Sequence, residues 1–191
     1  MTLSQQLRSA TKALHTQAER AGLMPRLLRG ELPLERYVLL LRQLLAIYEA
    51  LESALRQPGA PEFDPGMARA AALRADIAWL APQGPADPLT HPAREYVARL
   101  QTLPPVQLAA HAYVRYLGDL AGGQVLARIV GRAYGLQQEG LAFYRFEADA
   151  PTLVLGLREV LDALPEAEQP AIVAEAQAAF GRHIDLFEAL A

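Results

Sequence analysis

One histidine lies among polar side chains at helical spacing near the start of the chain. Arg8 and Lys12 precede His15 by seven and three residues, and Glu19 follows it by four. On a helix these offsets place all four side chains on one face. A polar stripe of this kind is unusual on a helix that packs against a core, which suggests a role for the histidine. An exposed polar face with a histidine that has no role fits the same residues, so both interpretations stay open.

Three further histidines are His91, His111 and His183, and the chain has no cysteine. No two of the four histidines have the spacing that places two imidazoles on one turn of helix. The sequence therefore argues against a histidine-rich zinc site, a thiolate centre and an iron–sulfur cluster. It leaves a metal held by a single imidazole as an option.

Three glycines, Gly118, Gly122 and Gly123, fall inside a stretch with a helical pattern. Each costs about 1 kcal/mol relative to alanine in a helix, so stability alone does not explain them. They could end a helix, allow close contact with a neighbouring helix, or bare the backbone for a flat ligand. The helical pattern resumes at Val125, so we expect a kinked, continuing helix.

A carboxylate, Asp119, follows the first of these glycines, four residues after Arg115. An ordinary exposed ion pair at this spacing would contribute only a few tenths of a kcal/mol. On an otherwise apolar helix, an inward-facing carboxylate could instead hold a water molecule or steer a proton. The residues leave these two interpretations evenly balanced.

The elements that must position these residues are all expected to be helices. Helical spacing predominates and strong strand runs are missing, so we predict an all-α fold. The predicted helices span about 3–20, 33–56, 65–79, 92–103, 105–134, 152–164 and 166–190, with a loop at 82–85 and an extended segment at 143–146. No repeat or long linker divides the chain, so we predict one domain over residues 1–191.

Composition excludes several classes of protein. The 191 residues are 52% hydrophobic and 20% charged, which indicates a globular chain. A formal net charge of -3 argues against a nucleic-acid partner. The N-terminus lacks the pattern of a signal peptide, and apolar runs are far shorter than a membrane span, so we expect a cytoplasmic protein without a membrane partner.

Two motifs resemble those of a known family. Residues 10–19, ATKALHTQAE, resemble the proximal-helix motif of the haem oxygenases, and residues 112–124, AYVRYLGDLAGGQ, resemble their distal-helix motif. The resemblance continues through residues 47–52, 140–144 and 179–188, so it covers nearly the whole chain in order.

The resemblance implies a single-domain helical bundle that holds haem between a proximal helix and a kinked distal helix. His15 then takes the role of axial ligand to the haem iron, with Glu19 near its imidazole. The distal glycines Gly118, Gly122 and Gly123 would touch the porphyrin. Asp119 would anchor a proton-delivering water network, with Arg115 and Tyr48 as further members.

The resemblance also assigns the rim of the haem. Arg8, Lys12 and Arg158 match basic positions that meet the haem propionates, and Tyr113 matches a tyrosine at the same edge. Two positions depart from the family pattern: a lysine found in mammalian members is Val154 here, and a small hydroxyl residue is Ala121. At Val154 the chain therefore lacks one cation that mammalian members have near the propionates.

The implied activity is oxidative cleavage of haem b to biliverdin, carbon monoxide and ferrous iron. Haem is both cofactor and substrate, and the reaction uses O2 and electrons from a ferredoxin, a flavodoxin or a flavin reductase. The chain resembles soluble bacterial members, expected to be monomers, whose biliverdin could pass to a phytochrome. The alternatives are a haem carrier or sensor on the same fold, which needs no proton relay, and a helical interaction module, which leaves the glycines unexplained.

Overall fold

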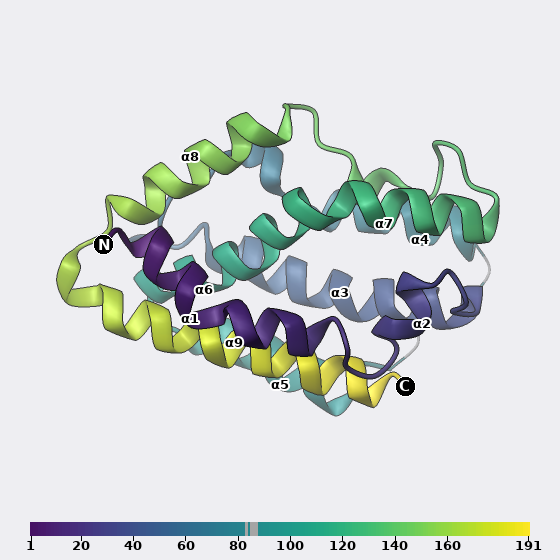
Figure 1. The fold of residues 1–191 in the computed structure, drawn as a ribbon, viewed down its shortest axis with the longest axis horizontal. Coiled ribbons are helices and arrows are strands. Elements are labelled where there is room, and N and C mark those ends of the chain that lie inside the picture. The colour runs from purple at the N-terminus through teal and green to yellow at the C-terminus, as the bar shows by residue number, and fades with distance from the viewer. Residues whose placement is uncertain (83, 85–87) are drawn as a thin grey trace.

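Helices make up the fold of the described residues, 1–82, 84 and 88–191, of this computed structural model, and no strand occurs among them (Figure 1). The predicted all-α class is confirmed. The α-helices are α1 (Leu3–Ala18), α2 (Met24–Leu28), α3 (Leu34–Ala54), α4 (Ala70–Leu80), α5 (His91–Thr102), α6 (Leu108–Ala112), α7 (Gly118–Tyr134), α8 (Ala150–Asp162) and α9 (Gln169–Ala189). Short 3-10 helices lie at Pro65–Met67, Pro105–Gln107, Ala142–Tyr144 and Glu166–Glu168.

Local signals account for the ends of the helices that carry the candidate site. Thr2 and Gln5 form a capping box that satisfies free N–H groups at the start of α1. The carboxylate of Asp149 caps α8 by accepting a hydrogen bond from the Thr152 amide. Helix α7 ends at Gly135, whose φ of 68° is the left-handed conformation that glycine adopts readily.

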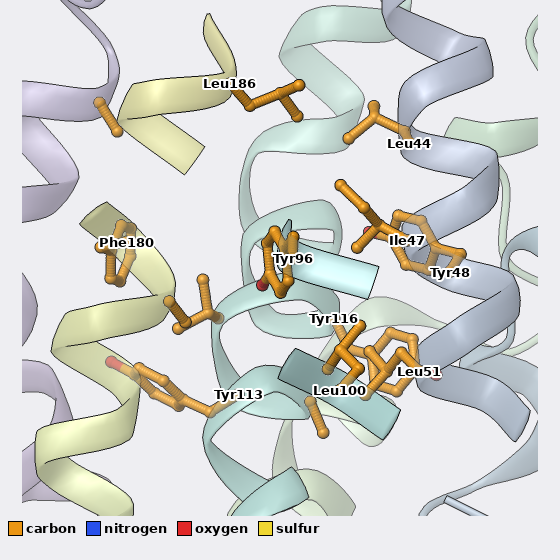
Figure 2. Close-up of a cluster of buried hydrophobic side chains, with 14 of the residues drawn as sticks. Leu44, Ile47, Tyr48, Leu51, Tyr96, Leu100, Tyr113, Tyr116, Phe180 and Leu186 are labelled. Atoms are coloured by element: carbon orange, nitrogen blue, oxygen red, sulfur yellow. The ribbon is translucent and has the colours of Figure 1, made fainter. Parts of the chain in front are cut away.

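The core lies between α3, α5, α6 and α9, and α1 lies side by side with α9 (Figure 1). Figure 2 shows part of this core, with labelled aromatic side chains from α3, α5, residues 113–117 and α9. Tyr48 from α3, Tyr96 from α5 and Tyr116 after α6 are all at most 2% exposed. Because these phenols are buried, each needs a polar partner, and this requirement shapes the candidate site.

The predicted helix over 105–134 is found in four pieces. A 3-10 turn leads into α6, a π-helical turn follows at Tyr113–Leu117, and α7 then runs to Tyr134. The helical stretch continues as predicted, but a π-helical turn interrupts the α-helix just before the glycines. The interpretation of Gly122 and Gly123 as a helix end is wrong, since α7 passes through both.

Other segments differ from the prediction in identifiable ways. Residues 143 and 144 are not extended, because they belong to a 3-10 turn whose first amides, those of Ala142 and Phe143, donate to the Asp76 carboxylate (both 2.8 Å), whereas Arg145 has extended backbone. Helix α2 was not predicted, and α4 begins at Ala70 because Pro65 starts only a 3-10 turn. Part of the predicted loop at 82–85 lies outside the described residues.

A buried ion-pair cluster joins α5, α6 and α9. The Glu175 carboxylate on α9, 6% exposed, accepts hydrogen bonds from Arg99 Nε (3.1 Å) and His111 Nε2 (3.0 Å). His111 Nδ1 lies 3.0 Å from the Tyr96 hydroxyl, which donates to it. Burial opposes ionisation of Glu175, but the hydrogen bonds from His111 and Arg99 outweigh it and lower its pKa to about 2.

This cluster predicts a loss of stability in acid. A lowered carboxyl pKa stabilises the folded chain above the ordinary value of 4.5, and that contribution is lost as pH falls toward 2. The full contribution is about 3 kcal/mol. We expect Glu175→Gln to lower the free energy of unfolding at neutral pH and to lose less of the remainder between about pH 5 and 3 than the parent chain. Urea unfolding at several pH values measures both, and parallel pH profiles would contradict the prediction.

Candidate functional site

His15 lies on the exposed face of α1. Its side chain is 57% exposed, and Nδ1 lies 3.7 Å from Oε1 of Glu19, which caps the end of the helix. This distance allows electrostatic attraction but exceeds a hydrogen bond. The ring of Phe180 on α9 approaches the imidazole edge-on, with centroids 6.0 Å apart. With Nδ1 toward the carboxylate, Nε2 is the nitrogen available to a metal.

The predicted rim residues lie on neighbouring helices. Arg8 and Lys12 are exposed on α1, and Arg158 is exposed on α8, which contacts α1. Within the described part of the chain, none of the three forms an ion pair. Tyr113 is 7% exposed, with its hydroxyl 3.5 Å from the hydroxyl of Thr11 on α1. The structure therefore brings these four residues to one end of the bundle.

Two of the three glycines present bare backbone. A Cβ atom added at Gly118 or Gly122 would meet nothing within 4 Å, so neither residue serves close contact with another helix. The two are one turn apart and form a flat strip on one face of α7. A planar ligand could lie against this strip, and a side chain there would fill the space. Gly123 differs, since its Cβ would lie 3.7 Å from the ring of Tyr144.

Asp119 is buried, with a side chain only 9% exposed. The hydroxyl of Tyr48 donates a short hydrogen bond to Oδ2 of this carboxylate. Arg115 Nε donates to the same hydroxyl at 3.0 Å, and Arg115 Nη2 lies 3.6 Å from Asp119 Oδ1. The structure therefore brings together the three residues predicted to act as a network. The interpretation of Asp119 and Arg115 as an exposed ion pair is wrong.

Burial governs the electrostatics of this network. Desolvation raises the pKa of Asp119, while the positive charge of Arg115 and the hydrogen bond from Tyr48 oppose the rise. Burial also raises the pKa of Tyr48 well above its ordinary value. The hydroxyl therefore stays protonated as a donor, and the carboxylate binds a proton more readily than an exposed one does.

His183, to which no role was assigned from the sequence, is only 2% exposed and belongs to α9. Its Nε2 contacts Nη1 of Arg115, and its Nδ1 lies 2.9 Å from the carbonyl oxygen of Ala179. A sequence signal was available. His183 continues a helical stripe of otherwise apolar buried residues, Ile172, Ala176, Ala179, Leu186 and Leu190. A lone imidazole in such a stripe requires polar partners.

Comparisons with known proteins decide the family. A family model described as Heme oxygenase matches residues 1–189. The chain belongs to the haem oxygenase family. "Heme oxygenase 1" of Bos taurus is 40% identical over 206 residues, which cover 98% of this chain and 71% of that protein. "Heme oxygenase 2" of Synechocystis sp. is 38% identical, covering 93% of this chain and 78% of the relative.

Solved structures of the family share the fold. The structure titled as haem oxygenase-2 from Synechocystis sp. PCC 6803 in complex with haem and NO is 35% identical, has a TM-score of 0.92, and covers 100% of this chain and 85% of that one. Haem oxygenase from Leptospira interrogans is 28% identical, with a TM-score of 0.91 over 98% and 99% of the two chains. Proteins with this name are enzymes, so the chain belongs to an enzyme family.

Two surface hollows lie apart from this site. They have volumes of about 540 and 510 Å³ and flank the segment 136–145, and neither is lined by His15, Gly118 or Asp119. Over the residues that the structure describes, no helix is both long enough and apolar enough to cross a membrane.

Proposed function

We propose that the chain is an active haem oxygenase that opens haem b to biliverdin, carbon monoxide and ferrous iron. The proposal rests on the arrangement of residues at the start of α7. There the bare backbone of Gly118 and Gly122 lies next to a buried carboxylate, Asp119, with a raised pKa. A flat ligand on this strip would have a proton-handling group beside it.

The fit to haem is supported on both sides of the ligand. We assign His15 as the axial ligand through Nε2, with Glu19 orienting the ring. Gly118 and Gly122 would leave room for the porphyrin, and Gly123 would seat the helix against Tyr144. When bound, haem supplies the iron that activates O2 and is itself the molecule cleaved.

The chain contributes proton control on the distal side. Asp119 would hold a water molecule, and Tyr48 would fix the orientation of that carboxylate through its hydroxyl. Arg115 keeps the hydroxyl and the carboxylate in place and supplies the compensating charge. A haem carrier or sensor would need His15 but would gain nothing from this buried network, which favours the enzyme.

The wider setting follows from the reaction. We propose a single domain, residues 1–191, working as a cytoplasmic monomer without nucleic-acid or membrane partners. The net charge of -3 supports the exclusion of nucleic acid. Electrons would come from a ferredoxin, a flavodoxin or a flavin reductase, and a phytochrome is a candidate recipient of the biliverdin.

Aerobic turnover of the haem complex with a reductant tests the proposed function. We expect the Soret band to give way to the spectrum of biliverdin. Asp119→Ala should bind haem with nearly unchanged affinity, because the carboxylate contacts Tyr48 and Arg115 and is not proposed to hold the porphyrin, yet should yield little biliverdin. Normal rate and yield in this variant would refute the proton-handling role, and a parent chain that binds haem without cleaving it would favour the carrier.

His15→Ala should abolish turnover and change the ferric spectrum, because the iron loses its protein ligand. The chain offers a matched control in His91, an exposed helical histidine with Glu95 four residues later at 3.4 Å. His91→Ala should leave the spectrum and the turnover unchanged. The assignment of His15 would be wrong if its variant kept the ferric spectrum of the parent chain.

If haem contacts the glycines, replacing Gly122 should raise the stability of the fold while it lowers the affinity for haem. Gly122→Ala should raise the free energy of unfolding by about 0.5–1 kcal/mol, since the added methyl meets nothing and favours the helix. It should also weaken haem affinity, because the methyl occupies the space of the porphyrin. Gly156→Ala on α8, where a Cβ is equally unhindered, is the control that should gain stability without losing affinity. Haem titration and urea unfolding measure the two effects, and unchanged affinity in Gly122→Ala would contradict the contact.

Arg8, Lys12 and Arg158 are proposed to orient the haem through its propionates. Exposed ion pairs contribute little affinity but fix the rotation of the ring, so single replacements by glutamine should alter the ratio of biliverdin isomers more than the haem affinity. Chromatography of the products measures this ratio. Arg132→Gln, an exposed cation at the far end of α7, is the control. An unchanged ratio in all three variants would contradict the orienting role.

A further inference from the structure

The two hydrogen-bond partners of the His183 ring determine which of its nitrogens carries a proton. Nδ1 lies 2.9 Å from the carbonyl oxygen of Ala179, which can only accept a hydrogen bond, so Nδ1 carries the proton. Nε2 contacts Nη1 of Arg115, and a guanidinium can only donate. Nε2 must therefore be unprotonated, and the ring is a neutral imidazole that accepts a hydrogen bond from Arg115.

The groups around the ring support this state. Burial, followed by the positive charge of Arg115, lowers the pKa of His183 well below its ordinary value, and His111 on α6 adds to the effect. The ring of Tyr96 on α5 meets the imidazole edge-on at 5.1 Å, and Phe187 on α9 lies at 5.9 Å. None of these neighbours offers a negative charge that would favour protonation.

His183 is the third polar partner of the Arg115 guanidinium, beside Tyr48 and Asp119. The guanidinium donates from Nε to Tyr48, faces Asp119 with Nη2, and reaches His183 with Nη1. Its side chain is 11% exposed, so water cannot readily replace a missing partner. His183 is in turn fixed to its own helix through Ala179. The position of the guanidinium is therefore set from α9 as well as from α3.

We propose that His183 is a positioning residue for haem cleavage, a neutral acceptor that holds Arg115 in place so that Tyr48 and Asp119 keep their orientation. This inference rests on the proposed function, in which Asp119 handles a proton. His183 has no assigned contact with haem. Its effect would pass through Arg115, and its removal would disturb proton delivery while leaving the His15 side of the site intact.

Two replacements separate hydrogen bonding from packing. His183→Leu keeps a buried side chain of similar bulk but offers no acceptor. His183→Gln can place its amide oxygen near the present position of Nε2 and accept from Arg115. Ile172→Ala, a core truncation three turns earlier on α9, is the control for a general loss of stability, since Ile172 is fully buried and outside the network.

The first measurement uses the chain without haem. Nitrogen-15 spectra of the imidazole should show Nδ1 protonated and Nε2 unprotonated, with no titration between about pH 5.5 and 8.5. His183→Leu should shift the side-chain resonances of Arg115, and His183→Gln should shift them less. A ring that titrates in this range, or Arg115 resonances insensitive to both variants, would overturn the proposal whether or not the chain cleaves haem.

The second measurement is the yield of biliverdin per haem consumed. We expect about a ten-fold loss in His183→Leu, substantial recovery in His183→Gln, and an unchanged yield in Ile172→Ala despite a lower unfolding midpoint. Equal yields in the Leu and parent chains, or equal losses in the Leu and Gln variants, would overturn the proposal. If the parent chain makes no biliverdin, the proposed function fails and the positioning role fails with it, while the spectra still decide whether His183 holds Arg115.

Discussion

The arrangement of the bundle depends on one buried cation. Arg115 lies in the π-helical turn between α6 and α7, and its guanidinium requires partners on every side because water has little access. Tyr48 from α3, Asp119 from the first turn of α7 and His183 from α9 provide them. Breaking any of these contacts leaves a buried polar group unpaired, so three helices are fixed relative to one another by a single side chain.

This constraint also links the two sides of the candidate site. Helix α9 carries Phe180, whose ring contacts His15, and one turn later carries His183, which holds Arg115. His15 and, through Arg115, Asp119 are thus positioned by neighbouring turns of one helix, which lies along α1 (Figure 1). The π-helical turn directly precedes Gly118, where an added Cβ would meet nothing within 4 Å, and the neighbouring Asp119 side chain is only 9% exposed.

Much of the fold was predictable because helical spacing and capping signals are local. The all-α class and most helix positions follow from them. The family motifs predict that His15, Asp119 and the glycines belong to one haem site. The π-helical turn at 113–117 was not predictable, because such a turn has no residue signature comparable to the glycines that follow it. The 3-10 turn at 142–144 depends on Asp76, more than sixty residues away. His183 was missed because its partner, Arg115, is distant in sequence.

We propose that haem lies against the bare backbone of α7, with His15 on its other side and Asp119 beside it. A crystal structure of the chain with haem bound tests this claim most directly. We predict van der Waals contact between the porphyrin and the backbone of Gly118 and Gly122, His15 Nε2 as the iron ligand, and a retained contact between Tyr48 and Asp119. Haem bound in the hollow beside Arg128 and Arg132, or ligated by another histidine, would contradict it.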